Sequence, residues 1–573
     1  MAPVGAAPVP DQRMIKAMTQ VELDATTPES SPATGHFDVI IIGSGISGMY
    51  QLHLLRGAGL SVRVLEAGSD VGGTWYWNRY PGARLDSETY SYQYAFTKDL
   101  LAEWDWSEQF AGQPELERYF HEVADRYDLR KDIEFDSRVT SMDFDPDTND
   151  WAVVTEDGTR RTAHIVITAT GVLSAPIYPR IPGIDRFQGE SYHTGLWPRD
   201  KAVSFAGKRV AVIGTGSTGV QAITEIGKTA GHLTVFQRTA NWAVPLNNAP
   251  ISADEMATIR AGYPEMFDRL QNTFSGFLHD WDPTPTTDHD DAALQERFET
   301  AYRGRGFSKW IGLPNDIATD EVANKKWSDF LSAKIRGRVD DPRTAELLIP
   351  NDHYFGSKRV PCETGYYETY NRDNVDLISI RDNPIEEITE TAIRTAQGTI
   401  EVDMIVYATG FEAFTGALKR IDITGLSGKK LAETWADGPV TFLGVQVSGF
   451  PNLFIMGGPH GKGGHGNGPR CAEKVQEWMA EFTQYIFDEH ITRVEADPRA
   501  EAEWTEEVQQ RALGGLMATA KSIFFGDNLE DDHDPSTKTR KRVYVAYVGA
   551  LSEYVKRLQD LAKSGYPGFI ITK

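Results

Sequence analysis

Two segments of the chain repeat one pattern, in which a β-branched run leads directly into three glycines at fixed spacing. The first copy reads VIIIGSGISG over residues 39–48, and the second reads VAVIGTGSTG over residues 210–219. Such a run suits a strand that is buried on both faces. Glycines in this order allow a tight turn, close approach of a pyrophosphate, and packing of the next helix on the strand. The repeat predicts an α/β protein with two Rossmann-like dinucleotide-binding domains.

The first copy continues into a complete nucleotide-binding unit. A helical stretch and a second apolar strand, 62–65, follow the glycines, and Glu66 closes that strand. A pyrophosphate is expected at the start of the helix, where unpaired N–H groups and the helix dipole favour anions. The Glu66 carboxylate is placed to accept hydrogen bonds from a ribose diol. The residues expected to bind this nucleotide are Gly43, Gly45, Ile46, Ser47, Gly48 and Glu66.

The second copy differs from the first at the end of its second strand. The run 233–236 is followed by Gln237, Arg238 and Thr239, where an NAD site would carry Asp or Glu. A carboxylate there would repel a 2′-phosphate, whereas arginine pairs with phosphate through two parallel hydrogen bonds. This unit is therefore expected to bind NADPH rather than NADH. Its expected binding residues are Thr215, Gly216, Ser217, Thr218, Gly219, Gln221, Arg238 and Thr239.

The segment between the two units carries a spaced signature. It reads FQGESYHTGLWP, with Phe187, Gly189, His193, Trp197 and Pro198 at the fixed positions. The signature resembles that of type I Baeyer–Villiger monooxygenases, and the resemblance extends over nearly the whole chain. It implies an oxidoreductase that uses FAD, NADPH and O2 to convert a ketone substrate into an ester or lactone. We expect His193 to couple the domains.

A second pattern of this family follows the first unit. Residues 72–86, GGTWYWNRYPGARLD, match it at every fixed position. In the family this segment runs along FAD, and its closing Asp lies near the flavin ring and the catalytic arginine. Tyr76 and Trp77 are expected to pack in the core instead. By the resemblance, the further FAD-binding residues are Gly73, Thr74, Trp75, Asp86, Tyr92, Val139 (through its backbone) and Gly468.

The stretch LLIPNDHYFGSKR, residues 347–359, resembles the family's active-site loop. The implied chemistry passes through a C4a-peroxyflavin, which must stay anionic to attack a carbonyl, and the following adduct is also negative on oxygen. A permanently charged guanidinium stabilises such an oxygen without changing its own protonation state. We therefore expect Arg359 to be catalytic and also to contact the cofactor, with Asp86 paired to it. Lys358 is expected to reach the NADP 2′-phosphate, and His353 to be structural.

Two ATG turns, at 169–171 and 408–410, lie on either side of the second unit, which is typical of flavoproteins with two dinucleotide domains. The FAD-binding domain is thus expected to be discontinuous. Residues 251–345 contain several amphipathic helical stretches, and this helical insertion is expected to form one wall of the substrate cavity. The predicted divisions are a mobile N-terminal extension at 1–35, an FAD-binding domain at 36–180 and 396–573, and an NADP-binding domain at 199–395 with a helical insertion at about 251–345.

Charge and cysteine content exclude several other functions. A net charge of −24 argues against nucleic acid or an anionic membrane as a partner. Cys362 and Cys471 form no CxxC pair, which fits a reducing cytoplasm. No apolar run approaches the roughly 18 residues needed to span a bilayer. His460 and His465 lack an acidic or thiol partner nearby, so no metal site is expected, and nothing requires more than a monomer.

The C-terminal third departs from the family pattern. Many relatives carry Trp where this chain has Ile523, on a mobile loop that closes over the nicotinamide ribose. The stretch 529–534 is unusually acidic and 538–542 is basic. Together with the glycine-rich loop 457–468, these changes suggest a roomier pocket, for bulky cyclic or steroid-like ketones. The sequence does not name the ketone.

The nearest alternative function is that of a flavin monooxygenase which oxidises amine or sulfide heteroatoms. That branch usually ends the connecting signature with an aromatic other than Trp-Pro, and it lacks the pair formed by Arg359 and Asp86. A pyridine-nucleotide disulfide reductase is excluded by the missing CxxC. A further alternative is a non-enzymatic redox-sensing module. Such a module would not take up oxygen in proportion to the ester formed from a test ketone.

Overall fold

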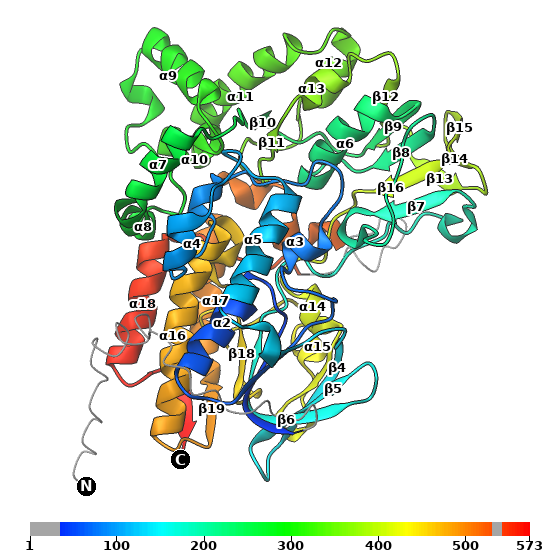
Figure 1. Ribbon diagram of the computed structural model, residues 1–573. Helices are drawn as coiled ribbons and strands as arrows, with labels where there is room; N and C mark the ends of the chain where they lie inside the picture. The colour runs from blue at the N-terminus through cyan, green and yellow to red at the C-terminus, as the bar shows by residue number, and fades with distance from the viewer. Residues whose placement is uncertain (1–34, 530–540) are drawn as a thin grey trace.

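The structure is a computed structural model that describes residues 35–529 and 541–573 (Figure 1). The expected N-terminal extension therefore lies outside the described residues, except for residue 35. The same holds for the acidic stretch beyond residue 529 and for the first part of the basic stretch. Over the described residues the chain forms two α/β units, a helical insertion, and a C-terminal helical segment that packs on the first unit.

The first unit is built on an eight-stranded sheet. Its central strand is β1 (His36–Ile42), with β2 (Val62–Leu65) and β6 (Arg160–Thr168) parallel to it on either side. Residues 39–42 are buried, as expected for a central parallel strand. Two further strands come from beyond residue 410, so this sheet is discontinuous in sequence. The remaining strands are β3 (Ile133–Glu134), β4 (Val139–Asp145), β5 (Asp150–Thr155), β17 (Asp422–Thr424) and β18 (Leu453–Ile455).

The second unit is a five-stranded, all-parallel sheet. In order across the sheet its strands are β12 (Val375–Ser379), β9 (His232–Gln237), β8 (Arg209–Ile213), β16 (Met404–Tyr407) and β7 (Glu190–His193). β16 corrects the domain boundary expected at 396, because it pairs with β8 and not with the first sheet. A buried apolar strand must pair its backbone groups on both sides, and β16 has its two neighbours only here. The connecting signature likewise contributes an edge strand, β7.

The segment expected as a helical insertion is largely helical; in Figure 1 helices α9, α11 and α12 lie at the top, and α7 and α8 lie lower on the left. Several of them begin at a side chain that accepts a hydrogen bond from the first turn, which stabilises the start of the helix. These caps are Ser252, Asp290, Asp320 and Asp341. The helices are α7 (Ala253–Ala261), α8 (Tyr263–Asn272), α9 (Asp291–Arg303), α10 (Ser308–Ile311), α11 (Glu321–Arg336) and α12 (Pro342–Leu348).

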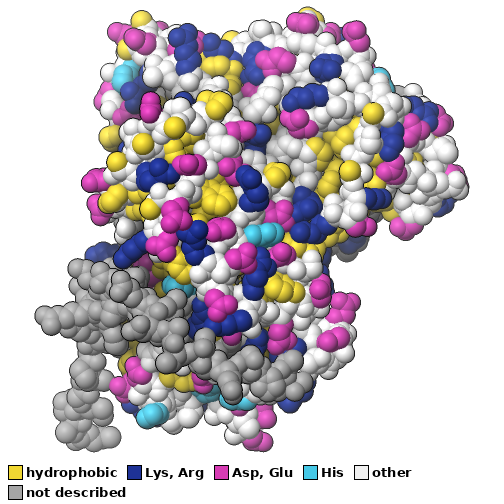
Figure 2. Space-filling model, in the orientation of Figure 1, with side chains coloured by type: hydrophobic (Ala, Val, Ile, Leu, Met, Phe, Trp, Pro, Cys, Tyr) yellow, Lys and Arg dark blue, Asp and Glu magenta, His cyan; other side chains and the backbone are white. Residues whose placement is uncertain are grey.

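The C-terminal third completes the first unit. The long helix α16 (Gly468–Asp488) packs along α2 (Ile46–Gly57) and also contacts α18 (Leu551–Lys563). One hydrophobic cluster accordingly joins residues of α2 to residues of α16, α17 (Pro498–Leu513) and α18. None of the described helices combines the length and the apolar character that crossing a bilayer requires. On the face shown in Figure 2, acidic and basic side chains are interspersed.

Candidate active site

The first glycine turn is closed too tightly for any side chain. Gly43 has a φ of +104°, and a Cβ there would lie 2.7 Å from the carbonyl oxygen of Ala169. At Gly48 a Cβ would lie 1.8 Å from the Gly43 oxygen. Gly45 packs against Gly73, where a Cβ would lie 2.7 Å from the Gly45 Cα. This all-backbone cradle fits a dinucleotide such as FAD, whose pyrophosphate binds main-chain N–H groups.

The helices that follow the two glycine turns both begin without a side-chain cap. Gly45 precedes α2 and Gly216 precedes α6 (Ser217–Thr229), each in an extended conformation. The first N–H groups of a helix have no acceptor within the helix. They are therefore available to an anion. In the two helices these groups include the amides of Ile46, Ser47, Ser217 and Thr218.

Glu66 holds the first turn from within. Its carboxylate accepts hydrogen bonds from the Ser44 N–H at 2.7 Å, from the Ser44 Oγ at 3.0 Å and from the Gly68 N–H at 2.8 Å. A carboxylate offers about four acceptor sites, so the expected bond to a ribose would be an addition to these three. Sequence reasoning found the position of Glu66 and missed Ser44, whose only signal was its place between two motif glycines.

Three of the expected FAD-binding residues meet beside this turn. Trp75 Nε1 donates to Tyr92 Oη at 3.3 Å, and the two rings lie edge to face. A Cβ at Gly468, the first residue of α16, would lie 3.6 Å from the same oxygen. Burial raises the pKa of Tyr92 to about 12, so its hydroxyl stays neutral. Thr74 opens α3 (Thr74–Trp77) and is exposed.

Tyr76 lies in the core, as expected: it is buried, and its hydroxyl accepts a hydrogen bond from the Ser69 N–H at 2.8 Å. Trp77 is only partly buried, with its ring edge to face against Tyr76. Val139 is buried at the start of β4, in the strand expected for it.

The second glycine turn repeats the first. Gly214 has a φ of +109°, and a Cβ there would lie 2.4 Å from the Ala408 oxygen. At Gly219 it would lie 2.3 Å from the Gly214 oxygen, whereas at Gly216 it would meet nothing within 4 Å. Each ATG turn thus supports the first glycine of one unit. Thr215 Oγ1 donates to the Thr239 carbonyl at 2.9 Å and ties this turn to the loop after β9.

Cations gather beyond the end of β9. Arg238 is exposed, and Lys358 is half-buried within electrostatic range of it. Burial lowers the pKa of Lys358; Asp352 opposes this, and the charges of Arg238 and Arg381 lower the pKa further. The side chain of His353 is buried and its Nδ1 lies 2.6 Å from Asp352 Oδ1, which fits a structural role. Sequence reasoning missed Arg381.

Arg359 and Asp86 are brought together from different units. Arg359 Nη2 lies 3.4 Å from Asp86 Oδ2. The Asp86 side chain is 6% exposed and that of Arg359 is 39% exposed, so the carboxylate is the deeper partner. Burial raises the pKa of Asp86, and the Arg359 charge counteracts it. Asp86 Oδ1 and Arg359 Nε are buried without a hydrogen-bond partner among the described residues, which leaves capacity for a ligand.

The helical insertion supports Arg359 with aromatic rings. The guanidinium lies 5.1 Å from the Phe307 ring centroid and 5.9 Å from that of Trp310, within range of cation–π attraction. Asn241 Nδ2 donates to the Arg359 carbonyl at 3.2 Å. From the sequence this region was expected only to form a wall of the substrate cavity, because no local pattern links residue 307 to residue 359.

Gln221, expected beside the cofactor, lies at the seam between the units. Tyr80 Oη donates to its Oε1 at 2.7 Å, and its Nε2 donates to the Arg84 carbonyl at 3.2 Å. A Cβ at Gly82 would lie 2.7 Å from the Gln221 carbonyl oxygen. Both ends of the Gln221 amide are thus engaged by the first unit. This arrangement gives Gln221 a role in joining the two units.

His193 lies where the connecting segments meet. Its Nδ1 accepts a hydrogen bond from the Gly195 N–H at 3.0 Å. Its ring is 5.1 Å from that of Tyr178 and 5.9 Å from that of Phe411, which come from the two crossings between the units. Burial lowers the pKa of His193 to about 4, so the ring is neutral at pH 7. These contacts agree with the expected coupling role.

The C-terminal loop packs on the first unit and reaches the second crossing. Ile523, at the start of η10 (Ile523–Phe525), is partly buried against the first core, and Asn528 Nδ2 donates to the Phe411 carbonyl at 2.8 Å. His460 is buried, with Nδ1 3.3 Å from Thr441 Oγ1. Among the side chains that the structure describes, no three His, Cys, Asp or Glu residues are grouped to hold a metal ion.

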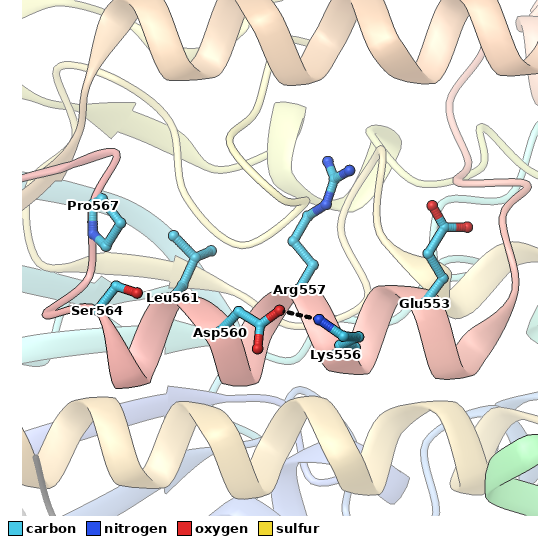
Figure 3. A pocket seen from close by; sticks show the side chains of 7 residues that line it. All are labelled: Glu553, Lys556, Arg557, Asp560, Leu561, Ser564 and Pro567. Carbon is cyan, nitrogen blue, oxygen red and sulfur yellow. Dashed lines mark hydrogen bonds and ion pairs between the residues drawn. The ribbon is translucent and has the colours of Figure 1, made fainter.

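A surface pocket on α18 lies apart from these groups (Figure 3). Its walls carry charged side chains, and Lys556 and Asp560 are paired across one turn of the helix. The pocket contains none of the residues expected to bind FAD or NADPH. It is lined by Glu553, Lys556, Arg557, Asp560, Leu561, Ser564 and Pro567.

Comparison with known proteins gives matches over most of the chain. The family described as FMO-like, flavin-binding monooxygenase-like, matches residues 37–323. The 2-oxo-Δ3-4,5,5-trimethylcyclopentenylacetyl-CoA monooxygenase of Pseudomonas putida is 44% identical, over 94% of this chain and 98% of that protein. The phenazine N-monooxygenase PhzNO1 of Lysobacter antibioticus is 40% identical, over 94% and 97%. Other relatives, 38–40% identical, are named acetone, cyclohexanone and cyclopentanone monooxygenases.

Solved structures match the whole architecture. OTEMO in complex with FAD and NADP superposes with a TM-score of 0.89 at 43% identity, and the match covers 95% of this chain and 100% of OTEMO. The two-unit arrangement described above is thus the arrangement of a flavoprotein that also binds NADP.

Proposed function

The chain belongs to the flavin-binding monooxygenase-like family, and we infer that it is a Baeyer–Villiger monooxygenase that converts a ketone into an ester or lactone with FAD, NADPH and O2. We propose that the first unit holds FAD and the second holds NADPH. The observation that carries the catalytic assignment is the Arg359–Asp86 pair, which joins the two units and retains an unpaired N–H and an unpaired carboxylate oxygen.

Bound FAD, once reduced by NADPH, supplies the activated oxygen. Arg359 stabilises the negative charge that develops on the carbonyl oxygen of the ketone, and its charge does not depend on pH in the working range. Asp86 fixes the guanidinium from its buried side. Phe307 and Trp310 cover part of that guanidinium, which limits its contact with water and strengthens its electrostatic effect.

The test is to replace Arg359 by Ala and to follow three quantities with purified protein and a ketone panel. We expect ester formation to fall by about two to three orders of magnitude, the usual cost of removing one such donor. Anaerobic reduction of the flavin by NADPH should remain, because Arg359→Ala leaves both glycine turns intact. Arg359→Lys tests whether charge alone is enough. Ester formation by Arg359→Ala at a rate close to that of the unaltered protein would refute the role.

Oxidation of a heteroatom is a second candidate, because the relative PhzNO1 is named as an N-monooxygenase at 40% identity. The two functions separate in one assay that offers a cyclic ketone and an aromatic N-heterocycle together. Ester or lactone as the main product supports ketone oxidation. An N-oxide without any ester would instead show that the function is heteroatom oxidation.

We propose, further, that the substrate is a bulky cyclic ketone and that the protein acts as a monomer in the cytoplasm. Both cysteines are buried and free, which fits a reducing compartment. The substrate proposal is supported by the relative that acts on a trimethylcyclopentenyl ketone. A ketone panel graded by ring size, and the mass in solution by light scattering, test these two statements.

A further inference from the structure

Two arginines follow neighbouring parallel strands at the same edge of the second sheet. Gln237 at the end of β9 and Ser379 at the end of β12 lie opposite each other. The Ile380 N–H donates to the Gln237 carbonyl at 2.8 Å, so the pairing continues past the last residue of β12. Arg238 and Arg381 come directly after this point. The carboxyl ends of parallel strands are where open α/β sheets bind their ligands.

The active-site loop is fastened across this edge. Gln237 Nε2 donates to the Leu347 carbonyl at 2.7 Å, and Trp242 Nε1 donates to the His353 carbonyl at 3.2 Å. The loop thereby brings Lys358 within electrostatic range of both Arg238 and Arg381. The loop thus gathers three cations from three separate segments, Arg238, Lys358 and Arg381, at one corner of the second sheet.

Asp352 holds Arg381 in this corner. Arg381 Nη2 lies 2.6 Å from Asp352 Oδ2, while the other carboxylate oxygen binds His353. The Arg381 side chain is 46% exposed. Its Nε and Nη1 groups meet no acceptor within the described chain. Asp352 thus orients the guanidinium and leaves donors for another partner.

The charges at this corner match a phosphate monoester. Three positive groups, Arg238, Lys358 and Arg381, face the Asp352 carboxylate, and a second carboxylate that acts on Lys358, Asp527, is itself paired with Arg542 at 3.1 Å. Two positive charges therefore remain, in a chain whose net charge is −24. A phosphate monoester carries about −1.5 to −2 at pH 7. Clustered cations of this kind repel one another unless an anion separates them.

We propose that Arg381 is a third residue that binds the 2′-phosphate of NADPH, beside Arg238 and Lys358, and that it helps the protein to distinguish NADPH from NADH. The inference rests on the proposed function, in which the second unit holds NADPH. It adds a residue that comes from β12, a strand without any glycine motif of its own.

The test measures binding to the purified holoprotein by calorimetry, with 2′,5′-ADP and with 5′-AMP, which lacks the 2′-phosphate. For Arg381→Ala we expect affinity for 2′,5′-ADP to fall about tenfold, as for the loss of one charge-assisted contact at a partly exposed site. Affinity for 5′-AMP should stay within about twofold, which also shows that the variant is folded. The affinity of Arg381→Lys for 2′,5′-ADP should lie between those of the unaltered protein and Arg381→Ala, because lysine keeps the charge but lacks the paired donors of the guanidinium. Arg372→Ala, which removes the same charge at the other end of β12, is the matched control.

The variant Arg238→Ala separates the two levels of the proposal. If Arg238→Ala weakens 2′,5′-ADP and Arg381→Ala does not, the role of Arg381 is refuted and the NADPH assignment stands. If neither variant affects 2′,5′-ADP, the location of the NADPH site is wrong as well. An equal loss for 2′,5′-ADP and 5′-AMP in Arg381→Ala would show a structural effect and would also refute the role.

Discussion

The two nucleotide-binding units contain the same kind of glycine turn and differ in the side chain that holds this turn in place. In the first unit the acidic group after the second strand, Glu66, is used inside the protein to hold Ser44 and Gly68. In the second unit a hydroxyl, Thr215, ties the turn to the carbonyl of Thr239. No carboxylate follows β9 there, and Arg238 remains exposed. The same backbone can thus serve two dinucleotides, and we propose that the residues just beyond the second strand decide which one binds.

The largest expected effect comes from the glycines that both turns share. In Gly48→Ala a Cβ would lie 1.8 Å from a carbonyl oxygen, and in Gly219→Ala the distance would be 2.3 Å. We expect Gly48→Ala to be purified without flavin, and Gly219→Ala to keep flavin but to lose its reduction by NADPH. The absorbance spectrum and anaerobic stopped-flow reduction measure the two outcomes.

The control for this pair is Gly57→Ala, at the far end of α2, where a Cβ would meet nothing within 4 Å. This variant should retain both activities and gain about 0.5–1 kcal/mol of stability from the better helix former. Loss of flavin from Gly219→Ala but not from Gly48→Ala would reverse the assignment of the two units.

The next largest effect is expected from a charge reversal that makes the second unit resemble the first. Arg238→Glu should weaken NADPH binding by about two orders of magnitude, because it removes a phosphate partner and adds repulsion. NADH binding should change little, since NADH has no 2′-phosphate. The dependence of flavin reduction on the concentration of each nucleotide measures both. An equal loss for NADPH and NADH would place Arg238 elsewhere on the nucleotide.

A smaller effect is expected from pH. The pKa of His53 in α2 and that of His193 are each lowered by burial to about 4, against about 6.5 in the unfolded chain. The unfolded chain therefore binds more protons between these values, so stability is full above pH 6.5 and is lost as the pH falls towards 4. At pH 5 each histidine should cost about 2 kcal/mol. Thermal unfolding from pH 7 to 5 measures this cost.

The two histidines also report on the two units separately. His53→Gln and His193→Gln should each flatten the dependence of Tm on pH. If the units unfold independently, each variant should affect only one transition. A pH profile identical to that of the unaltered protein in both variants would contradict the assignment of neutral, buried rings.

The smallest effect concerns the seam. Gln221→Ala removes the bonds to Tyr80 and to the Arg84 carbonyl, and we expect a loss of about 1–2 kcal/mol of stability. Tyr80→Phe removes only the first bond and should cost about half as much. Chemical denaturation measures both. A loss in Tyr80→Phe equal to that in Gln221→Ala would show that the Arg84 contact contributes nothing.

The sequence by itself determined the fold class and both glycine turns, and it predicted a helical insertion and a preference for NADPH at Arg238. These features are local: a turn that excludes every Cβ requires glycine, and a strand buried on both faces requires a short apolar run. The pairing of Arg359 with Asp86 was also anticipated, through the family resemblance and not from spacing.

Only the tertiary structure decided which sheet receives β16, which rings support Arg359, and that Arg381 stands beside Arg238. It also showed that Gln221 joins the units and that Glu66 closes its own turn. In most of these contacts the residues lie far apart in the chain and are aligned by strand register or by packing of the insertion. Register depends on backbone pairing across a whole sheet, which no short stretch of sequence contains.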